Sequence, residues 1–590
     1  MCTEIFRVND ANKAKDSFIT GEKLLLPLIG AQLQTSGITL DEALSMTSSC
    51  RFKVLLAVSL LKDIDKRLFC ETVVRWKGLF SEFRVAAIRQ GLKATFLSTS
   101  SLFHELKTSG STEKSVVADQ ITALNKGHQG RVINFLKDHA YRCWAAVAFF
   151  PVLPMVEKVL TPDELIIEYV FIGKHDENSL KASLELNILA FKPDGTREVC
   201  AVSEKTCVDA IKTWIRQWNI ATAENVSGIH SDEEKKLEAV GKDLSSVLFP
   251  TAIQNLIRHK DVKHIYLCPE PHFSMIPLRL LPGEDALPLF EGRTISSLGS
   301  CREIVRSEVM AQLDKDPDST SVEKVSNEAT GGCCIFFDPN FDHKLENPTS
   351  SSNYLWEQIC ALNPFQPMNT CHSLDNTLRE AYSIEDTLKA HQPDVNVHLF
   401  QGKEANLQSV ISLRSPLLVH FSTHGFGRLQ FQFELPNVSQ DDSGSGLALA
   451  GFNTYVAKKF ASIDPKASTG MLTPLTACGL DLANTRLVFL STCVSGVGVA
   501  QLQESTNSLA NAFRAAGALT VIATSWNIAD DATAEFVSHF YSALSQPDTR
   551  PSEALDRARV ELCKDPHFSS WRHWAGFSCY GDDIPVFSKE

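Results

Sequence analysis

The chain has 590 residues, of which 44% are hydrophobic and 22% are charged, a composition typical of globular proteins. Its length exceeds that of a usual single domain, so the sequence predicts more than one folding unit. The net charge of −13 disfavours broad binding to nucleic acids or to anionic membranes, because both require clusters of positive charge.

The cysteines and the apolar runs indicate a cellular location. The 16 cysteines are scattered along the chain without a C-x-x-C pair, as expected of buried thiols in a reducing compartment. The longest apolar run, residues 143–156, has 14 residues and two prolines, which is too short to span a bilayer. The first twenty residues mix charges throughout and do not resemble a secretory signal. We therefore expect a cytoplasmic protein, with the nucleus as the alternative location.

The first part of the chain has a helical pattern. Apolar residues recur at helical spacing in residues 54–87, and Thr39 followed by Glu42 fits a capping box at a helix start. The sequence contains no repeat of 34 residues or of a similar period, so a helical repeat array is not indicated. We predict an all-helical domain over residues 1–158 that binds a regulatory protein or the substrate.

Strand patterns begin near residue 160. Residues 165–172 are mostly β-branched and aromatic, and residues 264–268 have a similar composition, so both predict strands. The run at 184–191 is followed by the Pro-Asp-Gly sequence at 193–195, which predicts a hairpin turn.

From residue 331 onward, short hydrophobic runs alternate with helical segments. Such alternation predicts a mostly parallel sheet covered by helices, an α/β fold. The resulting organisation is a region over residues 159–590, divided into an adaptor-like part, 159–330, and a catalytic part, 331–590. The predicted strands are 333–338, 417–422, 486–491 and 519–526, and the predicted helices lie near 378–390, after residue 505 and after residue 531.

Two strand ends carry residues that could perform chemistry. His424 and Gly425 follow one hydrophobic run, and Cys493 follows another; in open parallel sheets, reactive groups gather at such carboxyl ends. If the two strands are neighbours, a thiolate nucleophile and an imidazole proton donor would lie side by side, and no metal or cofactor would be needed. Isolated cysteines and histidines are more often structural, so spacing alone leaves both interpretations open.

The segments that contain these residues read HFSTHG at 420–425 and LSTCVSGVG at 490–498. They resemble the motifs of the CHAT family of caspase-like cysteine proteases, which are relatives of separase. The resemblance covers roughly residues 160–587 and implies a caspase-like α/β fold and hydrolysis of peptide bonds in a protein substrate. Many members carry tetratricopeptide repeats ahead of the protease, whereas this chain has an unrepeated helical segment there. The motifs that carry the resemblance are HFSTHG at 420–425, SGLALAG at 445–451, LSTCVSGVG at 490–498, the segment 509–533, and WAGFSCYGD at 574–582.

The resemblance also implies roles for single residues. It makes Cys493 the nucleophile, His424 the general acid and base, and the backbone N–H groups of Gly425 and Cys493 the oxyanion hole. It makes His420 a structural residue, hydrogen-bonded beneath the active site, which disfavours a zinc site built from His420, His424 and Cys493. The piece after the nucleophile turn, residues 501–509, lacks the Gly-Glu-Gly that is usual in the family.

Asp530 and Asp531 follow a strand end that contains Trp526. Each carboxylate can cap a helix, or it can form an acidic wall of the substrate pocket. Separase-like relatives have an aspartate after a similar strand end that pairs with a basic side chain before the scissile bond. On this resemblance we predict that Asp530, with Asp531 as the second candidate, favours cleavage after a basic residue.

The prediction from the sequence is therefore a caspase-like cysteine endopeptidase without a cofactor. The first alternative is a catalytically idle CHAT scaffold that binds partners through its helical domain, since an intact Cys493 and His424 do not prove turnover. The second alternative is a zinc-dependent hydrolase.

Overall fold

The computed structural model of the chain describes most of the residues beyond 146 and fewer before them. The chain forms two compact units, Met1–Arg84 with Tyr141–Leu313 and Val85–Ala140 with Asp314–Glu590. Cys493 and the capping box predicted from Thr39 and Glu42 lie outside the described residues. The main described ranges, with short gaps in some, are 65–79, 146–174, 183–222, 231–314, 332–343, 371–426, 446–454, 470–492 and 509–588.

The boundary between the units differs in place from the predicted domain boundaries. Helices α4 (Lys66–Trp76) and α7 (Val152–Val159), predicted to lie in a separate domain over residues 1–158, belong to the same unit as the first strands. The boundary between the two units lies between Leu313 and Asp314, whereas the sequence predicted a boundary after residue 330.

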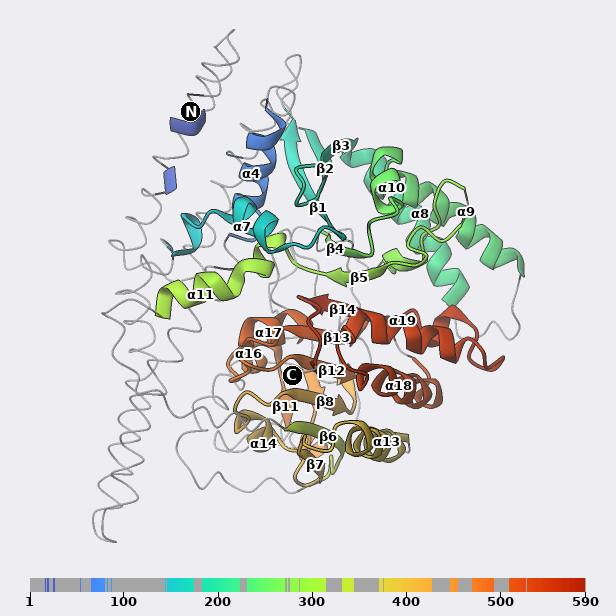
Figure 1. The fold of residues 1–590 in the computed structure, drawn as a ribbon. Coiled ribbons are helices and arrows are strands. Elements are labelled where there is room, and N and C mark those ends of the chain that lie inside the picture. Colours follow the sequence, from blue (N-terminus) through green and yellow to red (C-terminus); the bar gives the residue numbers. More distant parts are fainter. Residues whose placement is uncertain are drawn as a thin grey trace. The chain divides into compact units, whose positions relative to one another are not determined.

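The first unit contains a mixed sheet whose strands are ordered β3-β2-β1-β4-β5 (Figure 1). Strands β1 and β2, and likewise β2 and β3, pair antiparallel, whereas β4 pairs in parallel with β1 and with β5. The predicted hairpin turn is confirmed, and Gly195 adopts a φ of 90° between β2 and β3. The elements are β1 (Glu164–Lys174), β2 (Ser183–Phe191), β3 (Arg197–Ser203), α8 (Glu204–Thr222), α9 (Ser231–Leu248), α10 (Thr251–Ile257), β4 (His264–Cys268), η2 (Leu278–Leu280), β5 (Thr294–Ser297), η3 (Cys301–Val305) and α11 (Arg306–Asp314).

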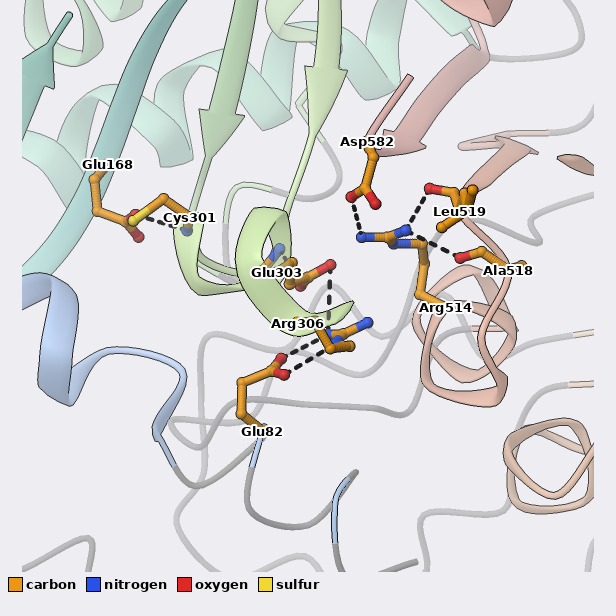
Figure 2. Close-up of polar contacts among 10 residues, drawn as sticks. Glu82, Glu168, Cys301, Glu303, Arg306, Arg514, Ala518, Leu519 and Asp582 are labelled. Carbon is orange, nitrogen blue, oxygen red and sulfur yellow. Dashed lines mark hydrogen bonds and ion pairs between the residues drawn. The ribbon is translucent and has the colours of Figure 1, made fainter. Parts of the chain in front are cut away.

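Buried charges join the helical segment before residue 84 to this sheet. Lys77, the C-cap residue of α4, lies 2.6 Å from the carboxylate of Glu168 in β1, and the two side chains are 3% and 0% exposed. The second oxygen of Glu168 accepts a hydrogen bond from the backbone N–H of Cys301 at 3.0 Å. Arg306 donates to both carboxylate oxygens of Glu82, at 2.8 and 2.6 Å (Figure 2). The described helical residues are thus part of the core of the first unit.

The second unit contains the predicted parallel sheet, with strands ordered β14-β13-β12-β8-β6-β7 (Figure 1). All pairs are parallel except that of β13 with β14. The predicted α/β fold class is confirmed, and each predicted strand of this part is found within two residues of its expected bounds. The strands are β6 (Cys333–Pro339), β7 (Val397–Gly402), β8 (Leu418–Ser422), β12 (Leu487–Ser491), β13 (Thr520–Thr524) and β14 (Phe577–Gly581), and a small antiparallel sheet joins β9 (Gly425–Phe426), β10 (Gly446–Ala448) and β11 (Met471–Leu472).

Helices cover both faces of the parallel sheet. One face packs against α13, α18 and α19 in a cluster that includes Ile335, Phe489 and Phe540. On the other face, Phe421 of β8 contacts Phe513 of α17, with ring centroids 5.7 Å apart. Among the described residues, no helix combines the length and the apolar character needed to cross a bilayer. The helices are α13 (Asn376–His391), α14 (Leu407–Ile411), α16 (Pro474–Cys478), α17 (Leu509–Ala516), α18 (Asp530–Leu544), α19 (Pro551–Leu562) and η4 (Trp571–His573).

Arg514 of α17 binds the backbone before β13 and the residue that follows β14. Its guanidinium donates to the carbonyl oxygens of Ala518 and Leu519 and forms an ion pair of 2.7 Å with Asp582 (Figure 2). Gly581 has a φ of 114°, and a Cβ at this position would lie 2.3 Å from the Leu519 oxygen. The Gly-Asp pair of the last motif therefore has a structural role, because only glycine permits this close approach.

The buried carboxyl group of Asp583 predicts a pH dependence of stability. Burial raises the pKa of Asp583 to about 7, although its oxygens accept hydrogen bonds from the backbone N–H and the hydroxyl of Ser552. The pKa of an aspartate in an unfolded chain is about 3.9, so the unfolded state loses its proton first as the pH rises. This group should therefore lower the free energy of unfolding by about 3 kcal/mol between pH 5 and pH 8, with little further change above pH 8.

The measurement compares wild type with Asp583→Asn in urea unfolding at pH 5 and pH 8. Asparagine accepts the hydrogen bond from the Ser552 backbone and tolerates the φ of 55° at this position. The variant should lose the pH-dependent difference that this carboxyl group causes. Equal changes with pH in both proteins would contradict the prediction.

Candidate active site

The strands that carry the two predicted catalytic residues are neighbours. Strand β8 pairs in parallel with β12, and Ser422 at the end of β8 lies opposite Ser491 at the end of β12. His424 and Cys493 each follow these paired serines by two positions. The sequence predicts that His424 and Cys493 lie side by side if their two strands are neighbours, and these strands are neighbours. Cys493 itself lies outside the described residues.

The backbone around His424 is fixed by the small sheet. The hydroxyl of Thr423 donates to the carbonyl oxygen of Ala448 at 2.6 Å, and the backbone N–H of Ala448 donates to the carbonyl oxygen of His424 at 2.9 Å. Gly425 opens β9 and lies opposite Leu447 of β10. The SGLALAG motif thus supplies the strand against which the end of β8 is held.

The imidazole of His424 is oriented by a backbone carbonyl group. Its Nε2 donates to the carbonyl oxygen of His372 at 2.7 Å, and its ring lies 5.5 Å from that of Phe341. Because a carbonyl oxygen can only accept, Nε2 must carry a hydrogen. In the neutral ring, Nδ1 is then the nitrogen with the free electron pair, and it is the one that can take a proton from a thiol.

A buried polar cluster lies beneath this site, as expected for a structural His420. The Nε2 of His420 lies 2.7 Å from the carboxylate of Glu380, and its Nδ1 lies 3.0 Å from the hydroxyl of Tyr541. The hydroxyl of Ser422 donates to the second oxygen of Glu380 at 3.0 Å. Burial raises the pKa of Tyr541 well above its usual value, so its hydroxyl stays protonated. The cluster engages both ring nitrogens of His420 and joins the end of β8 to α13 and α18.

The end of β12 is held from the neighbouring strand. The hydroxyl of Thr524, the last residue of β13, donates to the carbonyl oxygen of Thr492. Thr492 directly precedes Cys493 in the sequence. This contact fixes the backbone at the start of the predicted nucleophile turn.

Asp530 and Asp531 occupy the first two positions of α18, and the N-cap is Ala529. Neither aspartate is therefore the N-cap residue, although negative charge is favourable at both positions because of the helix dipole. One oxygen of Asp530 accepts a hydrogen bond from the backbone N–H of Asn376, at the start of α13, at 3.3 Å. Asp531 is exposed and accepts from the N–H of Ala532.

Several of the described cysteines are poorly suited to act as nucleophiles. Burial raises the pKa of the Cys334 and Cys371 thiols to about 11 and that of Cys70 to about 12. Cys563 is exposed, and its pKa is also raised. Because the thiolate is the reactive form, these thiols should react slowly at neutral pH.

Three groups at the site were not predicted from the sequence: the His372 carbonyl oxygen, Glu380 and Tyr541. A backbone oxygen leaves no trace in the sequence. Glu380 carried a signal, because it falls on the buried face of α13 in line with Thr377 and Ile384. A charged residue in such a stripe indicates a buried partner.

Comparison with known proteins agrees with the resemblance found in the sequence. Tetratricopeptide repeat protein 28 of Mus musculus is 23% identical over 430 residues, which is 62% of this chain and 17% of that protein. This chain therefore spans less than a fifth of the length of that curated relative.

Two solved structures match parts of this chain. A chain of the Saccharomyces cerevisiae separase–securin complex is 8% identical, with a TM-score of 0.46, and the match covers 98% of this chain and 37% of that one. The Arg-specific cysteine proteinase gingipain R of Porphyromonas gingivalis is 10% identical, with a TM-score of 0.33, covering 58% of this chain and 70% of that one.

Residues 238–582 match the model of the CHAT domain. Because this match covers more than half of the chain, the protein belongs to the CHAT-domain family.

Proposed function

We propose that this protein is a cysteine endopeptidase that hydrolyses peptide bonds of a protein substrate with Cys493 and His424. The observation that supports the proposal most is the register of β8 and β12, whose paired ends precede the two residues by equal distances. The cytoplasmic location expected from the scattered cysteines is part of the same proposal.

The reaction follows from the orientation of His424. With Nε2 donating to the His372 oxygen, Nδ1 accepts the proton of the Cys493 thiol, and the thiolate attacks the carbonyl carbon of the substrate. The imidazolium then protonates the leaving amine as the peptide bond breaks, which leaves a thioester. Water, activated by the neutral imidazole, hydrolyses the thioester and restores the thiol. The backbone N–H groups of Gly425 and Cys493 are the proposed donors to the oxyanion.

The test is hydrolysis of a peptide library by the full chain and by Cys493→Ala. Wild type should cleave members of the library, and the variant should have no activity above background. Folded wild type that cleaves nothing would instead favour the idle scaffold, in which the CHAT region binds partners without turnover.

The proposed specificity for a basic residue rests on Asp530. Its carboxylate is partly exposed at the start of α18, and one of its oxygens is engaged by the Asn376 N–H. An Arg side chain of the substrate would form a charge-assisted pair worth roughly 1.5–3 kcal/mol. Asp530→Asn should therefore lower the preference for Arg over an uncharged residue by about ten- to a hundredfold.

Asp531→Asn is the matched control, because it removes the same charge from the adjacent position of the same helix. Asp530→Asn keeps an acceptor for the Asn376 N–H, so both variants should have similar stability. Library profiling of the residue before the scissile bond compares the three proteins. A wild-type preference for acidic or bulky apolar residues would contradict the role of Asp530 and leave that of Cys493 untouched.

A further inference from the structure

A second layer of hydrogen bonds surrounds the peptide segment that orients His424. The segment, residues 371–373, precedes α13 and supplies the His372 oxygen that accepts the hydrogen bond from His424. It belongs to no helix or strand, so regular backbone pairing does not fix its position. Side chains that bind this segment therefore determine where the His372 oxygen lies.

Asn453 binds both backbone polar groups of Cys371. Its Oδ1 accepts from the Cys371 N–H at 2.8 Å, and its Nδ2 donates to the Cys371 carbonyl oxygen at 2.8 Å. The same Nδ2 donates to the carboxylate of Asp342 at 2.9 Å. Asn453 is 7% exposed, so water competes little for these bonds. A side-chain amide fits this position because it offers an acceptor and two donors at once.

The backbone that carries Asn453 is itself fixed. Its N–H donates to the carbonyl oxygen of Phe341 at 2.9 Å, and the N–H of Gly451 donates to that of Asn340 at 3.0 Å. Gly470 approaches the same stretch so closely that a Cβ there would lie 2.5 Å from the backbone nitrogen of Phe452. Asn453 thus connects the loop after β6 to the segment that holds the His372 oxygen.

A weaker contact holds the other end of the segment. The hydroxyl of Ser373 donates to the carboxylate of Asp338 at 2.8 Å, but Ser373 is exposed. His372 therefore lies between a buried anchor at Cys371 and an exposed anchor at Ser373. The buried anchor should contribute more, because hydrogen bonds are stronger where water is excluded.

We infer that Asn453 is a positioning residue for the reaction of Cys493 and His424. By fixing Cys371 it sets the direction of the His372 oxygen, which in turn keeps the hydrogen on Nε2 of His424 and leaves Nδ1 available to the thiol. The hydrogen bonds of Asn453 to described residues go to Cys371, Asp342 and Phe341, so its proposed role is one of positioning and not of catalysis. The inference rests on the proposed function for its consequence in catalysis, but the orientation of His424 can be measured without catalysis.

The first experiment compares kcat and KM of Asn453→Ala with those of wild type. We expect kcat to fall by roughly ten- to a hundredfold with little change in KM, since small displacements of catalytic groups have effects of this size. Thr454→Val is the matched control. It removes the hydrogen bond from Thr454 to the His343 oxygen, 2.9 Å long, in the same stretch of chain, and should leave kcat near the wild-type value. Equal losses in both variants would overturn the inference.

A double variant that exchanges two side chains and keeps the total charge distinguishes an effect of Asn453 on the position of the His372 oxygen from an effect on protein stability. The double variant Asn453→Asp with Asp342→Asn restores a hydrogen bond between these two side chains, and it keeps the acceptor for the Cys371 N–H. An ionised carboxylate cannot donate to the Cys371 oxygen. The double variant should therefore recover stability relative to Asn453→Ala but not kcat. Full recovery of kcat would overturn the inference, even if Asn453→Ala alone fails to fold.

The direct experiment measures the tautomer of His424 by NMR of the full chain labelled with ¹⁵N-histidine. All proteins carry Cys493→Ala, so that no thiolate can pair with the His424 ring. The spectrum of His424→Gln lacks the His424 signals and thereby identifies them. We expect the Nε2–H form with Asn453 present and a larger fraction of the Nδ1–H form in Asn453→Ala. An unchanged tautomer would overturn the inference. If wild type cleaves no peptide, the proposed function fails, while this measurement still decides the role of Asn453.

Discussion

His424→Ala should lower kcat/KM for peptide hydrolysis by roughly 10²–10⁴-fold, the usual contribution of a general acid and base. The physical reason is that both proton transfers, from the thiol and to the leaving amine, pass through this imidazole. Because Cys493 and His424 act as a unit, the double variant with Cys493→Ala should be no less active than Cys493→Ala alone. Steady-state kinetics on one library-derived peptide measures the effect.

His372→Ala provides the control for this measurement. The contact to His424 uses the backbone oxygen of His372, and the His372 side chain is exposed. Its removal should therefore leave kcat/KM within about twofold of wild type, a change of under 0.5 kcal/mol. Retention of more than a tenth of the activity in His424→Ala would contradict the assignment of the general acid and base.

Lys77→Met should lower the free energy of unfolding of the first unit by about 3–5 kcal/mol, because it leaves the buried carboxylate of Glu168 without its charged partner. The Lys77 ammonium also donates to the Cys268 carbonyl oxygen at 2.7 Å. Burial alone would lower the pKa of Lys77, but the carboxylates of Glu168 and Glu270 outweigh it and raise the pKa. Hydrogen exchange of the β1 backbone amides measures this loss of stability in the strand that contains Glu168.

Lys66→Met is the control, since it breaks an ion pair of the same kind on the same helix. Lys66 pairs with Glu198 at 3.5 Å, but these side chains are 52% and 40% exposed, so the change should be under about 1 kcal/mol. The double variant Lys77→Met with Glu168→Gln should recover most of the lost stability, because the buried side chain at position 168 is then uncharged. Similar protection of β1 in wild type and Lys77→Met would contradict this account.

The same contacts change how the role of the N-terminal helices can be tested. A fragment that starts near Leu153 would lack Lys77 and Glu82, which would leave the buried Glu168 without Lys77 and the Arg306 guanidinium with Glu303 but without Glu82. We expect such a fragment to be unstable, so deletion cannot isolate a regulatory function. Binding of a regulatory protein to the helical segment stays a prediction, and substitution of exposed residues on α4 is the suitable test.

Four strands of the parallel sheet, β6, β8, β12 and β13, could be predicted from the sequence because they are buried on both faces, whereas the half-exposed strand β7 was not predicted. Such strands form continuous hydrophobic runs, as in β8 and β12, and a run of this kind ends where the strand reaches the edge of the sheet. The position of His424 at a strand end followed directly. The short strand β5 has the sequence TISS, which has no such pattern and was not predicted.

The interactions that orient the site could not be predicted, because they join segments far apart in the chain. Asn453 and Cys371 are 82 residues apart, and the bond from His424 goes to a backbone oxygen that any residue at position 372 would supply. The ion pair of Lys77 with Glu168 likewise joins residues that lie far apart in the sequence. Hydrophobic periodicity indicates which face of a helix is buried, but it does not identify the partner of a single polar group.

The most direct test of the central claim is covalent labelling of the full chain with a panel of peptide acyloxymethyl ketones that carry basic, acidic or apolar residues next to the reactive group. The Cys493 thiolate would displace the carboxylate leaving group and form a thioether, which intact mass and peptide mapping can locate. We predict one adduct, on Cys493, absent from Cys493→Ala and formed far more slowly in His424→Ala. An unmodified Cys493 in folded wild type, or equal labelling of the exposed Cys563, would contradict the claim that Cys493 and His424 form a catalytic pair.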